Sequence, residues 1–139
     1  MAAVPNPAPS LRNEHRPLAS RRVLVVEDDD AIRSLLEVAL ADEGYEVRTA
    51  EHGSAALKIL DVWRPELILL DLMMPVLDGW AFRARQVADA SLATIPVIVL
   101  SAAYQASRQA EILAVAAVLA KPFDLDDLLA SVGDLISVH

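Results

Sequence analysis

Short apolar runs separated by longer amphipathic stretches are the feature that most constrains how this chain can fold. Residues 23–26, 67–70 and 97–100 are continuous apolar runs, typical of strands that are covered on both faces. The stretch after the first run has apolar residues at the helical spacing i, i+3, i+4 and i+7, namely Ile32, Leu35, Leu36 and Ala39. Strands that alternate with helices predict a parallel sheet with helices on both faces and right-handed crossovers.

The remaining segments complete a (βα)5 pattern. Residues 45–50 alternate apolar with charged side chains, which favours a strand at or near a sheet edge, and residues 115–119 form a weakly marked final strand. We expect Gly44 to end the first helix and Asp124 to be the N-cap of the last. Further helices are expected over residues 54–60, 80–87 and 103–114.

Length and composition narrow the classes of protein. The 139 residues fit one domain, which we place at 21–139, after a Pro-rich arm at 1–20 that is expected to be mobile. The net charge of −8 argues against binding to nucleic acid or to anionic membranes. The chain has no Cys, no apolar run long enough to span a membrane and no secretory signal, so we expect a cytoplasmic protein.

Polar residues follow the apolar runs at the points where the expected strands end. Glu27 and Asp28 follow the first strand, Asp71 the third, Ser101 the fourth and Lys121 the fifth. Because ligands collect at the carboxyl ends of strands in an open parallel sheet, these side chains are candidates for one site. The three carboxylates would repel one another unless a cation lay between them, and Mg²⁺, which prefers oxygen ligands, suits that place.

Each of these residues also has an ordinary explanation when taken alone. The acidic run at 27–30 can be a solvated loop that caps a helix, and Asp71 can cap a turn. Ser101 can cap the next helix, and Lys121 can be a surface residue at a turn. The conjunction favours a functional site, because independent causes would rarely place all of them at one end of one sheet.

Four ordered motifs carry a resemblance to a known family. They are VVEDD at residues 25–29, LDLMMPVLDG at 70–79, VLSA at 99–102 and KPF at 121–123. Together they resemble the signature of response-regulator receiver domains of two-component signalling, of the chemotaxis-regulator type, over about residues 22–138. The resemblance implies a doubly wound α/β fold with a flavodoxin-like strand order 2-1-3-4-5.

The resemblance also implies a role for each matching residue. Asp71 would be the phosphoacceptor. Asp28, Asp71 and the backbone carbonyl of Met73 would bind Mg²⁺ or Mn²⁺, with Glu27 acting through a bound water. Ser101 and Lys121 would contact the phosphoryl group, and the peptide bond before Pro122 would be cis.

One departure from the family pattern lies on the output side. An aromatic residue is frequent three positions before the Lys, and this chain has Val118 there. The resemblance therefore covers the phosphoryl chemistry better than the way in which the signal is read.

The function that follows is that of a stand-alone phosphorelay receiver, not a conventional enzyme. A sensor histidine kinase or a histidine phosphotransfer protein would supply the phosphoryl group, and an unknown downstream protein would receive the signal. Two alternatives stay open: a receiver-like binding module that works without phosphorylation, and a metal-dependent aspartyl phosphatase. Phosphatases of that kind usually have a second acid two residues after the nucleophile, where this chain has Met73.

Overall fold

A computed structural model describes residues 21–71, 79–102 and 115–137. Its strands are β1 (Arg22–Val26), β2 (Glu46–Ala50), β3 (Leu67–Asp71), β4 (Val97–Ala102) and β5 (Ala117–Lys121). Its helices are α1 (Asp30–Asp42), α2 (Gly53–Leu60), α3 (Gly79–Ala88) and α5 (Leu125–Ser137). The arm expected at 1–20 and the helix expected over 103–114 lie outside the described residues.

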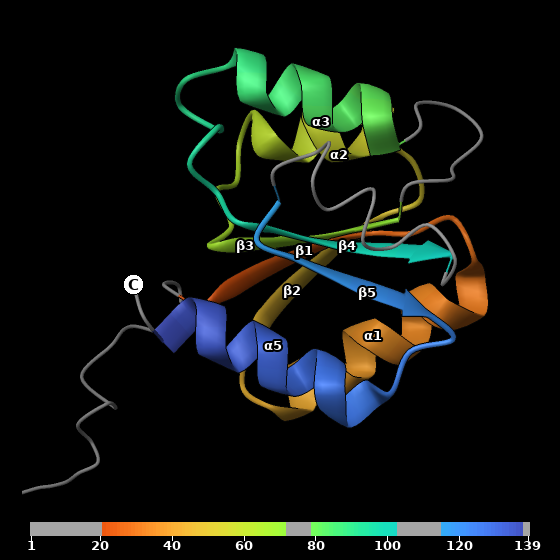
Figure 1. Cartoon of the computed structure of the whole chain (residues 1–139). Coiled ribbons are helices and arrows are strands. Elements are labelled where there is room, and N and C mark those ends of the chain that lie inside the picture. The colour runs from red at the N-terminus through yellow and green to blue at the C-terminus, as the bar shows by residue number, and fades with distance from the viewer. Residues whose placement is uncertain (1–20, 72–78, 103–114, 138–139) are drawn as a thin grey trace, which may run out of the picture.

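The five strands form one parallel sheet in the order β2-β1-β3-β4-β5, which confirms the predicted fold class and strand order. Helices α2 and α3 cover one face of the sheet, and α1 and α5 cover the other (Figure 1). None of the helices in the described ranges is long and apolar enough to cross a bilayer.

Alternate residues of each inner strand enter two separate apolar cores, as the two-residue period of a strand requires. In β1, Leu24 and Val26 pack with Phe82 on the α2 and α3 side. Val23 and Val25 pack with Leu36 on the α1 and α5 side. Burial on both faces explains why β1, β3 and β4 are continuous apolar runs in the sequence.

Local signals place the helix ends close to where the sequence predicted them. After α1, Gly44 has a φ of 96° and its N–H donates to the Ala41 carbonyl, a left-handed C-terminal cap that glycine accepts without strain. Before α5, Asp124 Oδ1 accepts from the backbone N–H of Asp126 at 2.8 Å, which confirms it as the N-cap.

The final strand is the element whose predicted bounds differ most from the structure. The sequence predicts this strand at residues 115–119, whereas β5 runs over Ala117–Lys121. It pairs with β4 from Ile98↔Ala117 to Ala102↔Lys121. All five residues of β5 are half-buried. The apolar run around this strand covers residues 112–120 and begins well before Ala117, so it does not mark where the strand begins.

Candidate functional site

Three carboxylates meet at the carboxyl end of the sheet. Glu27 and Asp28 directly follow β1 and Asp71 is the last residue of β3, and these two strands pair so that Val26 lies beside Leu70. One carboxylate oxygen from each of the three side chains lies within 4.8 Å of the others. Glu27 and Asp71 are buried, whereas Asp28 is exposed. The parallel topology thus brings together acids that are more than 40 residues apart in the sequence.

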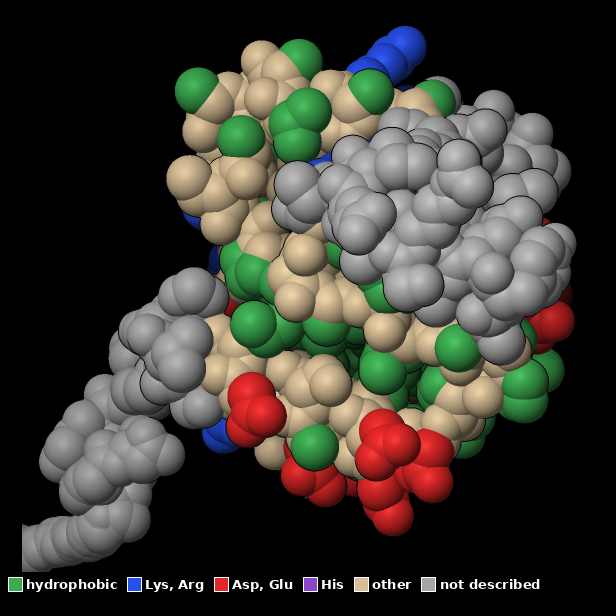
Figure 2. All heavy atoms as spheres, viewed as in Figure 1, with side chains coloured by type: hydrophobic (Ala, Val, Ile, Leu, Met, Phe, Trp, Pro, Cys, Tyr) green, Lys and Arg blue, Asp and Glu red, His purple; other side chains and the backbone are tan. Residues whose placement is uncertain are grey.

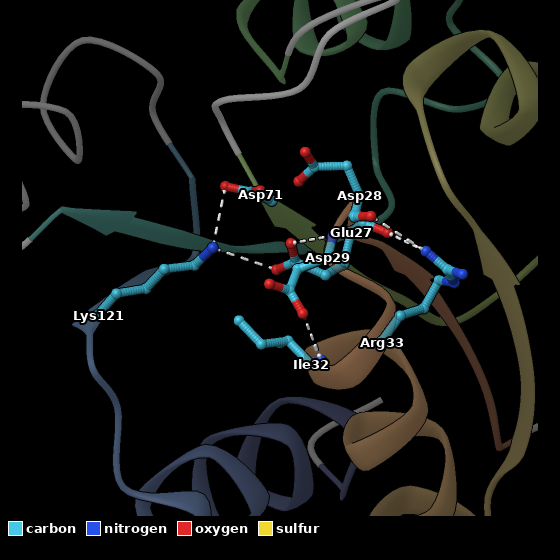
Figure 3. A network of polar contacts seen from close by, with 7 residues as sticks. All are labelled: Glu27, Asp28, Asp29, Ile32, Arg33, Asp71 and Lys121. Atoms are coloured by element: carbon cyan, nitrogen blue, oxygen red, sulfur yellow. Dashed lines mark hydrogen bonds and ion pairs between the residues drawn. The ribbon is translucent and has the colours of Figure 1, made fainter.

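Lys121 reaches this cluster from the end of β5. Its Nζ lies 3.2 Å from Glu27 Oε1 and 3.4 Å from Asp71 Oδ1. Figure 3 shows the lysine side chain extending to both carboxylates, with the Asp28 carboxylate turned toward Asp71. One ammonium group therefore pairs with two buried acids, and the third acid of the cluster, Asp28, is exposed to solvent.

The electrostatics of the cluster favour an additional cation. The pKa of the Glu27 carboxyl is raised from 4.5 to about 7, mainly by burial and in part by the nearby charge of Asp71, against the opposing effects of the Asp29 N–H and Lys121. Burial lowers the pKa of the Lys121 ammonium, but the charges of Asp71 and Glu27 outweigh burial and leave this pKa above its ordinary value. The positive charge of one lysine therefore does not fully offset the negative charge of the three carboxylates.

The donor set fits a small divalent cation. Carboxylate oxygens are the ligands that Mg²⁺ and Mn²⁺ prefer, and Mg²⁺ usually uses one or two carboxylates and keeps several waters. Asp28 and Asp71 offer such oxygens within 4.8 Å of each other, and a bound cation would offset the charge of Asp71, which adds to the effect of burial on the pKa of Glu27.

The four acids at 27–30 have three different roles. Asp29 Oδ1 accepts from the Ile32 N–H at 2.9 Å and is the N-cap of α1. Asp30 pairs with Arg33. The capping explanation is therefore correct for Asp29, while Glu27 and Asp28 face Asp71 (Figure 3).

The other predicted site residues are only partly described. Ser101 lies in β4 beside Ala120 of β5, at the same end of the sheet, but its side chain lies outside the described residues. Met73 lies outside them altogether. The Lys121–Pro122 peptide bond is cis. Val118 is half-buried and packs against the core on the α2 and α3 side.

Arg33 is a residue near the site that the sequence analysis missed. Its guanidinium donates to the backbone carbonyls of Glu27 and Asp28, at 3.0 and 3.4 Å. The spacing of Arg33 from Asp30 indicates an ion pair on one helix face. Nothing in the spacing indicates the contacts with the preceding loop.

Comparisons with known proteins agree with this geometry. A model of the response regulator receiver domain family matches residues 23–133. The chain is 36% identical over 117 residues to the DNA-binding dual master transcriptional regulator RpaA of Synechocystis, covering 83% of this chain and 48% of that protein. The chain spans about half the length of the curated relatives it matches.

Solved structures show the same likeness. The receiver domain of a signal transduction histidine kinase from Syntrophus aciditrophicus has a TM-score of 0.77 and 28% identity, covering 84% of this chain and 89% of that one. The receiver domain of a sensor histidine kinase from Pseudomonas aeruginosa, solved with a magnesium ion in its active site cleft, has a TM-score of 0.76 and 28% identity, with coverages of 84% and 98%.

Proposed function

This chain belongs to the response regulator receiver domain family, and we propose on that basis that Asp71 accepts a phosphoryl group and that the domain then signals by a change of conformation. The observation that carries the proposal is the placement of Asp71. Its carboxylate lies at the end of a buried strand, 3.4 Å from Lys121 Nζ and within reach of the Asp28 and Glu27 carboxylates.

The proposed reaction is attack by an Asp71 carboxylate oxygen on the phosphorus of a phosphohistidine. A P–O bond forms, the P–N bond breaks, and the histidine of the donor leaves as an imidazole that regains its proton. Besides the attacking carboxylate, the domain contributes position and charge, as phosphoryl transfer generally requires. Lys121 would neutralise one phosphoryl oxygen, and the Ser101 hydroxyl would donate to another.

A divalent cation, Mg²⁺ or Mn²⁺, would neutralise charge that develops on the phosphoryl oxygens. Asp28, Asp71 and the Met73 carbonyl would hold the ion, with Glu27 acting through a bound water. The acidic cluster within 4.8 Å supports this assignment.

The proposed partners are proteins. A sensor histidine kinase or histidine phosphotransfer protein would supply the phosphoryl group, and a downstream protein would read the conformational change. Absence of nucleic-acid binding rests on the net charge of −8 alone. The name of the Synechocystis relative includes DNA binding, so this expectation stays a prediction, as does a cytoplasmic location.

Two other functions are less well supported. A binding module that works without phosphorylation would have no use for a buried Glu27 and a lysine arranged around a buried Asp71. Aspartyl phosphatases usually have a second acid two residues after the nucleophile, where this chain has Met73. The proposed domain is therefore a phosphoacceptor, not a conventional enzyme.

The test is phosphorylation of purified protein by acetyl phosphate with Mg²⁺, followed by intact mass spectrometry. We expect the wild type to gain a single phosphoryl group and Asp71→Asn to gain none. Asp61→Asn is a matched control, because Asp61 is an exposed carboxylate just after α2. Undiminished labelling of Asp71→Asn would refute the assignment.

A further inference from the structure

Arg33 is the one cation in the described ranges that holds the backbone of the acidic loop between β1 and α1. Its Nη1 lies 3.0 Å from the Glu27 carbonyl and 3.4 Å from the Asp28 carbonyl, and its Nη2 lies 2.5 Å from Asp30 Oδ1. The side chain is only 19% exposed, so it lies along the protein and not in free solvent. The two carbonyl contacts join the loop after β1 to the first turn of α1, in which Asp30 also lies.

The guanidinium lies on the opposite side of this loop from the carboxylate cluster. Figure 3 shows Arg33 to the right of the loop, with Asp71 and Lys121 to the left and the Asp28 carboxylate turned toward them. Arg33 contacts the carbonyls of Glu27 and Asp28 and leaves their carboxylates free to face Asp71. It therefore differs from Lys121, which contacts the carboxylates of Glu27 and Asp71 themselves.

We propose that Arg33 is a positioning residue for the cation site: it fixes the loop so that the Glu27 and Asp28 carboxylates face Asp71. This inference rests on the proposed function, because it assumes that these carboxylates hold a divalent cation. Four consecutive acids at residues 27–30 repel one another, and a cation held at the backbone of their loop stabilises the loop conformation.

Two effects of Arg33 on the cation oppose each other. Its positive charge repels a bound divalent ion, whereas its hydrogen bonds hold the ligand residues in place. The charge is largely offset because Asp30 lies in direct contact with the guanidinium. Partners that orient metal ligands typically contribute 10–100-fold to affinity, so the orienting effect is the larger one.

The shape of the guanidinium is part of the argument. Its planar fork can donate to two carbonyls and a carboxylate at once, while a lysine ammonium is a compact charge at the end of a flexible chain. Arg33→Lys keeps the charge and loses the fork, and Arg33→Gln loses the charge and keeps one short donor. The pair of variants therefore separates position from charge.

The test is isothermal titration of Mg²⁺ into the metal-free full chain, at a temperature at which circular dichroism shows each variant folded. We expect the Kd of Arg33→Gln to rise about tenfold, at the lower end of the range for such partners, and that of Arg33→Lys to rise about threefold. Arg85→Gln is the matched control, since Arg85 is exposed on α3 and carries the same charge. Its Kd should equal that of the wild type.

A second measurement separates positioning from general damage. With acetyl phosphate as donor, the Arg33 variants should need more Mg²⁺ for half-maximal phosphorylation, but the rate at saturating Mg²⁺ should return to within about twofold of the wild type. A loosened fold would lower the rate at every Mg²⁺ concentration, and that result would overturn the positioning role.

The outcomes also separate this inference from the proposed function. A wild-type protein that binds no Mg²⁺, or is not phosphorylated on Asp71, overturns the function and the inference with it. A wild type that binds Mg²⁺, with unchanged or tighter binding in Arg33→Gln, overturns the inference alone. Should Arg33→Gln not fold, Arg33→Lys tests the inference alone, because wild-type affinity for Mg²⁺ in that variant would contradict the need for the planar guanidinium.

Discussion

The two ends of the parallel sheet differ in how their charged groups are balanced. At the carboxyl end, the buried acids Glu27 and Asp71 share one lysine, and the pKa of Glu27 rises to about 7. At the amino end, Trp63 is 4% exposed, and its Nε1 donates to Glu46 Oε2 at 3.3 Å. Glu46 thus has a hydrogen-bond donor in Trp63 and a cation in Arg22, whereas the carboxyl end has an excess of negative charge.

The arginines of the amino end show how this balance arises. The Cζ atoms of Arg22 and Arg48 lie 5.4 and 5.0 Å from the Trp63 ring centroid, and Arg22 Nε lies 3.4 Å from Glu46 Oε1. Stacking on an aromatic face holds a guanidinium without a second carboxylate. The comparison indicates that the amino end stabilises the fold, while the carboxyl end gives up some stability for the proposed cation site.

The largest expected effect is at the amino end. Trp63→Ala should lower the free energy of unfolding by about 3–5 kcal/mol, because it leaves a cavity in the core and removes the partner of two arginines. Urea denaturation measures this loss. Trp63→Phe, which keeps an aromatic ring, should lose less. The Mg²⁺ affinity of the folded Trp63→Phe protein should be unchanged, and a large change would break the division between the two ends.

The second effect concerns pH at the carboxyl end. Glu27 has a pKa of about 7 in the folded protein against an ordinary value of 4.5, so between these values the folded chain binds more protons than the unfolded chain. The free energy of unfolding without metal should therefore fall as the pH rises from about 4.5 to about 7.

Glu27→Gln removes this dependence on pH. At pH 8 without metal, the variant should be more stable than the wild type by roughly 1–3 kcal/mol, since one pKa unit corresponds to about 1.4 kcal/mol. Urea denaturation over a pH series measures both proteins. If the difference between them grew as the pH fell toward 4.5, Glu27 would not carry a raised pKa.

The smallest expected effect is a gain in stability at the amino end. Gly133 lies within α5, and a Cβ added there would lie 3.9 Å from the Tyr45 hydroxyl, an ordinary contact. Gly133→Ala should raise the free energy of unfolding by about 0.5–1 kcal/mol through helix propensity. Thermal melting measures the gain, and a lower melting temperature would show that packing against Tyr45 is tighter than these distances indicate.

Most of the fold could be predicted from the sequence because a strand buried on both faces is a continuous apolar run. The inner strands β1, β3 and β4 are unbroken apolar runs, and Gly44 and Asp124 mark helix ends through backbone chemistry. The half-buried strand β5 lies in a longer apolar stretch whose ends do not match those of the strand, and its predicted bounds were shifted by two residues.

The candidate site shows the same limit. The carboxylates of Glu27, Asp28 and Asp71 could be predicted together because strand ends in a parallel sheet meet at one edge. The contacts of Arg33 and the surroundings of Trp63 could not, because they depend on the direction of long side chains across a loop or between strands. Sequence spacing does not record those directions.

The most direct test of the difference between the two ends compares the stability of wild type and Asp71→Asn at pH 8, with and without Mg²⁺. Without metal, Asp71→Asn should be the more stable protein, because it removes one of two buried acids that share Lys121. Mg²⁺ at 100 times its Kd should raise the free energy of unfolding of the wild type by about 2.7 kcal/mol and that of the variant by much less. Equal stabilisation of both proteins by Mg²⁺, or a metal-free variant less stable than the wild type, would contradict this account.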